Sequence, residues 1–141
     1  MGLENIYEGR ELWEEVTIVM KKSPKNLDFS AAPQFKPLEI TKATVLYDGP
    51  TRAVCPLFPR NVNSHATVAL AGIGFDRTRS VLVADPALDV SVIELTARGK
   101  GVSMKIERSN PLKGVSGVFT LQSTLAAIAR AKGAGQVMQI C

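Results

Sequence analysis

Two asparagines and an arginine give this 141-residue chain its strongest candidate for ligand chemistry, the segment Arg60-Asn61-Val62-Asn63. The segment opens a run of apolar residues at helical spacing, so we expect it at a helix N-terminus. Unpaired backbone N–H groups and the helix dipole favour an anion or a carboxamide there. Two interpretations remain open. Either both asparagines contact a ligand, or Asn61 caps the helix and Asn63 pairs with a nearby loop.

Other reactive residues offer weaker patterns. His65 and Cys55 suggest a thiol nucleophile, but no third group is evident to orient the pair. The simpler interpretation is a helix histidine that packs against a sheet or lies at its edge, with Cys55 as a small apolar residue. One histidine and two cysteines, Cys55 and Cys141, provide no zinc set, so we expect no metal site. Asp85 before Pro86 is first of all a turn initiator.

Composition and length predict one globular domain. With 45% hydrophobic and 21% charged residues, the chain is expected to bury a core. It has no apolar run of the ~20 residues that a membrane helix needs, no signal-peptide pattern and no disulfide framework, which predicts a cytoplasmic protein without membrane contact. The net charge of +4 has one local concentration, residues 21–25. We interpret it as a solvated strand end rather than a nucleic-acid site, because aromatic residues do not interleave with it.

Hydrophobic patterning predicts the elements that position these residues. Short β-branched runs bounded by turn residues predict strands. These strands are expected at 16–20, 43–47, 52–55, 80–84, 90–97 and 102–107. Apolar residues at helical spacing predict helices. These helices are expected at 3–13, 61–72 and 120–132.

These elements favour an α+β domain with helices on one face of the sheet. We expect 43–47 and 52–55 to form a hairpin, the last three strands to form a meander, and proline-rich 23–40 to be irregular. A dinucleotide-binding fold is disfavoured, because Gly72-Ile73-Gly74 falls at a helix end with Arg77 at the third glycine position.

Three stretches also carry a family likeness: Leu57-Phe58-Pro59-Arg60-Asn61-Val62-Asn63, then 66–78, then Val83-Ala84-Asp85-Pro86. They closely resemble the C-terminal domain of L-aspartate dehydrogenases, and a looser likeness extends over nearly the whole chain. The resemblance implies a sheet of the glyceraldehyde-3-phosphate dehydrogenase C-terminal type. Residues 1–141 would then form this one domain. The N-terminal Rossmann domain that binds NAD or NADP would be absent from the chain.

The resemblance also implies a reaction, the oxidation of L-aspartate to iminoaspartate, which can feed NAD biosynthesis. By position, Asn63 matches the asparagine that contacts the nicotinamide cofactor, and Asn61 lies beside it in the same motif. The family's catalytic histidine lies in an Asn-x-His-Glu segment, where ungapped alignment places Ser91, Ile93 and Glu94. Isoleucine cannot exchange protons, and loss of a positioned acid or base typically costs roughly 10²–10⁴-fold in rate.

Two hypotheses follow. The chain is either a substrate domain that works with a Rossmann domain or a separate nucleotide-binding chain, or a non-catalytic ligand-sensing or dimerisation module descended from that family. In both cases the isolated chain is expected to be inactive, because it supplies one wall of a hydride-transfer site. An exposed sheet face would suit a homodimer.

Overall fold

A computed structural model of the chain describes residues 3–35, 39–113, 116–117 and 119–131. Within these residues the strands form one sheet in the order β2-β3-β1-β4-β5-β6. The strands are β1 (Glu15–Lys22), β2 (Thr44–Pro50), β3 (Thr78–Ala84), β4 (Val90–Gly99), β5 (Val102–Lys113) and β6 (Ser116–Gly117). The α-helices are α1 (Leu3–Glu8), α2 (Thr51–Leu57), α3 (Asn63–Ala71) and α4 (Phe119–Ala131). Two 3₁₀ turns, Pro24–Asn26 and Pro33–Phe35, lie between β1 and β2.

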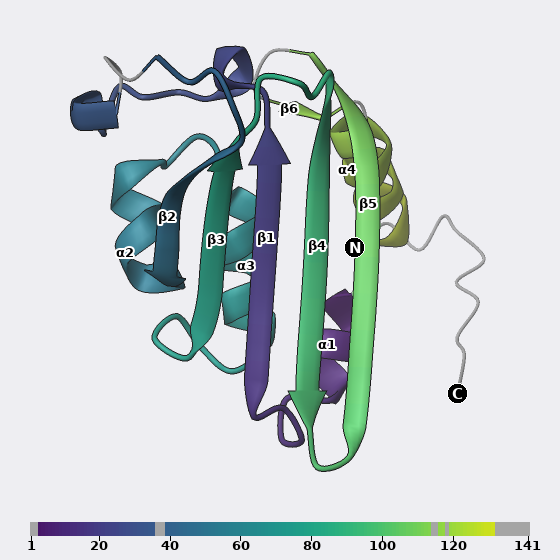
Figure 1. Cartoon of the computed structure of the whole chain (residues 1–141). Helices are drawn as coiled ribbons and strands as arrows, with labels where there is room; N and C mark the ends of the chain where they lie inside the picture. Colours follow the sequence, from purple (N-terminus) through teal and green to yellow (C-terminus); the bar gives the residue numbers. More distant parts are fainter. Residues whose placement is uncertain (1–2, 36–38, 114–115, 118, 132–141) are drawn as a thin grey trace.

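Strand β1 lies at the centre of the sheet, parallel to β3 and antiparallel to β4. Its side chains alternate, so that Val16, Ile18 and Met20 are buried while Thr17 and Val19 are half-exposed. Figure 1 shows α1, α3 and α4 behind the sheet and α2 beside its β2 edge. We call the side that carries Val16 the covered face and the opposite side the open face. The predicted α+β fold with helices on one face is confirmed.

An aromatic cluster fastens the long β1–β2 connection to the helices. Phe58, which follows α2, is fully buried. Its ring centroid lies 6.1 Å from that of Phe29 and 5.7 Å from that of Phe35. Both partners come from the connection that the prolines predict to be irregular, and the structure confirms that its described part has no strand or α-helix. Residues 36–38 of that prediction lie outside the described residues.

The hairpin and the meander are wrong. Residues 52–55 belong to α2, and β2 pairs antiparallel with β3 instead. The buried Thr51 hydroxyl donates to the Thr78 carbonyl oxygen at 3.0 Å, so the first turn of α2 lies against β3. Pro50, at φ −60°, is the N-cap residue of α2, a backbone angle that suits the entry to a helix. The meander fails because β1 lies between β3 and β4.

The other predicted strands and helices are confirmed with shifted ends. Strands β1, β3, β4 and β5 correspond to those expected at 16–20, 80–84, 90–97 and 102–107. Helices α3 and α4 correspond to those expected at 61–72 and 120–132, and residue 132 lies outside the described residues. The helix expected at 3–13 ends at Glu8, because the Trp13 side chain folds back over Gly9. There the indole Nε1 donates to the Ile6 carbonyl oxygen at 3.1 Å.

Candidate functional site

The segment before α3 holds the first candidate group. Asn61 is only 4% exposed, and its Oδ1 accepts a hydrogen bond from the Asp28 backbone N–H at 2.9 Å. Its Nδ2 donates to the Asn26 carbonyl oxygen at 3.3 Å. The predicted helix cap is therefore wrong, because Val62 is the N-cap residue and no side chain caps the helix. Asn61 instead ties the 26–28 segment to the start of α3.

Asn63 is the first residue of α3 and is exposed. Its carboxamide projects from a helix start whose first N–H groups have no side-chain cap. Nearby, Arg60 Nη1 lies 3.1 Å from Asp28 Oδ2. Hydrogen bonds from Ser30, with a smaller contribution from Arg60, hold the pKa of the Asp28 carboxyl below its usual range. Of the two asparagines in the motif, Asn63 is therefore the one whose exposed amide can meet a ligand.

A second group of polar residues lies on the covered face, where β1 ends. The predicted solvated strand end is wrong for Lys22 and Ser23, which are 4% and 5% exposed. Lys22 is buried because the alternation of β1 continues to its last residue. The antiparallel register brings Lys22 beside the buried Ser91 of β4, which pairs in turn with Asn110 of β5. Lys25, farther along the segment, is exposed as expected.

His65 lies on α3 within the same buried region and is fully covered. Neither ring nitrogen has a hydrogen-bond partner in the part of the chain that the structure describes. Burial, together with the charge of the Lys22 ammonium group, lowers the pKa of His65 to about 3. The imidazole is therefore neutral at ordinary pH, with one nitrogen as donor and the other as acceptor. The expected packing of a helix histidine against the sheet is confirmed.

Ile93 occupies the middle of this group. It is 6% exposed and pairs with Met20 of β1 on one side and Arg108 of β5 on the other. The Nε atom of Arg108 is buried without a hydrogen-bond partner among the described residues, and its guanidinium carbon lies 5.5 Å from the Phe119 ring centroid. Ile93 is one of the buried residues of the hydrophobic core, and its side chain provides no proton acceptor.

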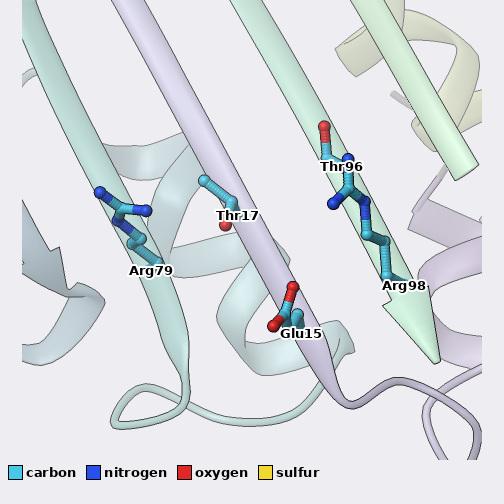
Figure 2. A pocket seen from close by; sticks show the side chains of 5 residues that line it. All are labelled: Glu15, Thr17, Arg79, Thr96 and Arg98. Carbon is cyan, nitrogen blue, oxygen red and sulfur yellow. The ribbon is translucent and has the colours of Figure 1, made fainter. Parts of the chain in front are cut away.

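The open face carries a groove of about 260 Å³ that sequence reasoning missed. Figure 2 shows Arg79 of β3 and Arg98 of β4 on either side of Thr17 and Glu15 of β1, with Thr96 also lining the groove. Arg79 makes a bidentate pair with Asp48, at 2.7 and 2.6 Å. The alternation of charged and apolar residues along β1 and β4 was the signal that could have indicated this polar face.

The remaining candidates have structural roles. Asp85 Oδ1 accepts from the Ala87 N–H at 3.0 Å, which confirms the predicted turn. Cys55 is half-buried on α2, and burial raises the pKa of its thiol, so the thiol is not activated as a nucleophile. Among the described residues no group of three or more potential metal ligands occurs. None of the helices in the described ranges is long and apolar enough to cross a membrane.

Comparisons with known proteins point to one family. A family model described as "Aspartate dehydrogenase, C-terminal" matches residues 7–131. An L-aspartate dehydrogenase of Methanosarcina barkeri is 36% identical over 80% of this chain and 46% of its own length. One of Serratia proteamaculans is 35% identical over 89% of this chain and 48% of its own length. The chain thus spans about half the length of these relatives.

A solved structure shares the fold. The crystal structure of aspartate dehydrogenase from Thermotoga maritima superimposes with a TM-score of 0.64 at 23% sequence identity. The match covers 91% of this chain and 49% of that one. The likeness supports the same α+β architecture, with the sheet covered on one face.

We predict that His65 makes stability depend on pH between 7.5 and 5. The histidine of the unfolded chain takes up a proton below its ordinary pKa of 6.5, whereas the histidine of the folded chain stays neutral down to a pH of about 3. The contribution of His65 to stability is therefore complete above pH 6.5 and decreases as the pH falls below that value. At about 1.4 kcal/mol per pH unit, the free energy of unfolding should fall by about 2 kcal/mol at pH 5. Urea unfolding at the two pH values measures this.

His65→Leu should abolish most of that pH dependence, because the chain has no other histidine. Asp76→Asn serves as the control. Hydrogen bonds from Arg52 lower the pKa of the Asp76 carboxyl, which therefore titrates below this window and should leave the response unchanged. Equal losses of stability in the wild type and in His65→Leu would contradict the assignment.

Proposed function

This chain belongs to the aspartate dehydrogenase C-terminal domain family, and on that premise we propose that it is the substrate half of an NAD(P)-dependent L-aspartate dehydrogenase-type oxidoreductase. The reaction would oxidise L-aspartate to iminoaspartate for NAD biosynthesis in the cytoplasm. The observation that carries the proposal is the exposed Asn63 amide at the uncapped start of α3, held in place by the buried Asn61.

The residues at this helix start fit a nicotinamide. The Asn63 carboxamide can both donate to and accept from the carboxamide of the cofactor, and the first N–H groups of α3 add donors. When bound, oxidised NAD or NADP supplies the hydride acceptor. Asn61 contributes by position, since its bonds to the 26–28 segment hold the backbone at which Asn63 starts.

The rest of the cofactor would need a partner. The chain spans about half of its relatives, and α4 presents an apolar row, Leu121, Leu125 and Ile128, which are 64%, 52% and 48% exposed. These residues are spaced to lie on one side of the helix. We assign this row to the docking of a Rossmann domain, in the same polypeptide or as a separate chain. Without that domain the nicotinamide and the substrate carbon are not held together, and the chain is inactive.

A second candidate function rests on Ile93. The resemblance aligns Ile93, which is buried, with the family's catalytic histidine, and in that alignment the domain lacks the imidazole that would accept the substrate proton. The alternative is therefore a non-catalytic module that senses a ligand or dimerises. Oxidation of aspartate by the wild-type chain joined to a Rossmann domain would exclude this alternative.

We also propose that the open face of the sheet binds a second copy of the chain. Half-exposed Val19, Val81 and Val92 form its apolar part, and the Lys21–Glu94 and Arg79–Asp48 ion pairs add charges of both signs. A face with balanced charges can complement itself across a twofold axis. The groove between Arg79 and Arg98 would then be closed by the partner copy.

Asn63→Ala should weaken NADH binding in the chain joined to a Rossmann domain by about 3- to 10-fold, because one or two hydrogen bonds are lost. Stability should change by less than about 0.5 kcal/mol, since Asn63 is exposed. Asn61→Ala is the matched comparison, and it should lower stability by about 1–3 kcal/mol through the lost bonds to the 26–28 segment. NADH fluorescence titration and urea unfolding separate the two effects. Wild-type NADH affinity in Asn63→Ala would refute the cofactor contact.

Ile93→His, in the same joined protein, should raise the rate of aspartate oxidation by at least about tenfold by restoring a proton acceptor. Initial rates of NADH formation measure the change. Ile93→Gln is the control, because it introduces a polar side chain that does not titrate, and its rate should stay at the wild-type level. An unchanged rate in a correctly folded Ile93→His variant would mean that the pocket itself has been remodelled.

Val81→Lys should convert a dimer to a monomer, because it places an unpaired charge near the middle of the open face. Leu70→Lys is the control, since Leu70 lies on α3 and is already 74% exposed. Sedimentation velocity at tens of micromolar reports the oligomeric state. A wild-type chain that sediments as a monomer would rule out the dimer.

A further inference from the structure

We propose that the outer edge of β5, the side of the strand that faces away from β4, pairs with the same edge of a second copy of the chain. The two strands would run antiparallel, with Ile106 of each copy at the centre, and the two sheets would join into one. This contact is separate from the proposed dimer through the open face. It does not depend on the proposed oxidoreductase activity.

The outer edge of β5 is long and, among the described residues, mostly unpaired. β5 pairs with β4 from Val102 to Pro111, whereas on its other side β6 pairs only with Leu112 and Lys113. Figure 1 shows β5 at one margin of the sheet, with α4 behind it. The unpaired backbone N–H and C=O groups of such an edge are a template for another strand. A docked strand would therefore extend the sheet.

The hairpin between β4 and β5 determines which backbone groups face outward. Its turn consists of Lys100 and Gly101, so Gly99 and Val102 form the first hydrogen-bonded pair. Hydrogen-bonded and non-hydrogen-bonded pairs alternate from there. Even-numbered residues of β5 therefore bond to β4, and odd-numbered residues direct their backbone groups away from it. The outward groups belong to Ser103, Lys105, Glu107 and Ser109.

Charge then selects one register for two identical strands. Outward groups can bond each other only where odd-numbered residues oppose odd-numbered residues. A pairing centred on Lys105 or on Glu107 places like charges opposite each other, which is destabilising. A pairing centred on Ile106 places Lys105 of each copy opposite Glu107 of the other, so the favourable pair occurs twice. Charges at a strand edge usually prevent pairing, but in this order they favour one self-complementary arrangement.

The surroundings of Glu107 favour a second lysine. The side chains of Lys105 and Glu107 are 63% and 55% exposed, and Lys105 Nζ lies 3.9 Å from Glu107 Oε2. Glu107 also lies opposite Glu94 of β4, whose carboxylate pairs with Lys21. Glu107 thus faces a like charge within its own sheet, and its ion pair with Lys105 is long and exposed. A lysine across the edge would improve this charge balance.

The paired segment has natural limits and a modest strength. Pairing centred on Ile106 spans residues 102–110, and Pro111, which has no N–H to donate, lies just beyond it. The contact consists mainly of backbone hydrogen bonds and exposed ion pairs, which each contribute little net stability. We therefore expect a dissociation constant of about 0.1–1 mM. At the tens of micromolar used to measure the open-face dimer, the edge contact is scarcely populated.

Backbone amide exchange tests the edge directly. The Val81→Lys variant isolates the edge contact from the open face. In this variant, raising the concentration from about 20 µM to about 2 mM should slow exchange of the odd-numbered amides from residue 103 to 109 by at least about twofold. The amides of Met104, Ile106 and Arg108 already bond to β4 and should exchange at an unchanged rate. An absent concentration dependence, or an equal change in both sets, would overturn the proposal.

Matched charge variants in the same Val81→Lys background test the register. At low ionic strength Lys105→Glu and Glu107→Lys should each weaken self-association by at least about tenfold, because like charges then face each other. An equimolar mixture of the two should restore association to the parent level, since the two acidic residues of one variant face the two basic residues of the other. Sedimentation equilibrium at about 2 mM measures both effects.

Two further variants control for a general effect of charge. Lys25→Glu and Glu8→Lys change exposed residues outside β5 and should self-associate like the parent. If they lose as much affinity as the β5 variants, or if the mixture of β5 variants stays as weak as its components, the assigned register is refuted. NADH binding and aspartate oxidation play no part in these measurements, so the outcome is distinguishable from that of the oxidoreductase proposal.

Discussion

The alternation of side chains along β1 is the constraint on which the rest of the structure depends. The strand pairs with β3 on one side and β4 on the other, so a slip of one residue would exchange its two faces. The buried apolar residues Val16, Ile18 and Met20 determine which face meets the helices. The same alternation carries Lys22 onto the covered face, so the buried cation is a consequence of strand register. The helices behind the sheet therefore meet a polar end of the core as well as an apolar centre.

Periodicity predicted most of the elements because their burial is one-sided. The alternation in β4, in which Ile93, Leu95 and Ala97 are buried, is readable from the sequence. The strand predicted at residues 52–55 is wrong because four residues are too few to distinguish a strand from a helix. The hydrogen bond that decides the structure there runs from the Thr51 hydroxyl to the carbonyl oxygen of Thr78, which is distant in the sequence. The parallel pairing of Val16 with Thr78 joins residues far apart in the chain. No local sequence signal predicts such a pairing, so the order of the strands in the sheet could not be predicted from the sequence.

The sequence predicted only part of the site, again because some of its contacts join residues that are far apart in the chain. The sequence placed Asn61 and Asn63 at a helix start, but whether Asn61 faces a ligand or the chain depends on the 26–28 segment that reaches it. The burial of Lys22 could have been found by extending the alternation of β1. The strand position that pairs with Arg108 could also have been predicted from the sequence. Lys100 and Gly101 have φ values of 46° and 80°, as a tight hairpin turn requires, and counting outward from this turn pairs Ile93 with Arg108. The contact between His65 and this face, in contrast, depends on how α3 packs.

The two candidate functions share one binding geometry and differ at one position. In the proposed alignment with the family, Ile93 stands where a proton acceptor is expected, while the Asn63 helix start and the cations of β1 and β5 are present. A module that only dimerises through the open face would be more stable with an apolar residue in place of His65, because buried polar groups without partners lower stability, and neither ring nitrogen has a partner among the described residues. The presence of His65 on the covered side, away from the proposed dimer surface, therefore favours a domain that binds a small polar ligand. Loss of catalysis at Ile93 would not remove that binding.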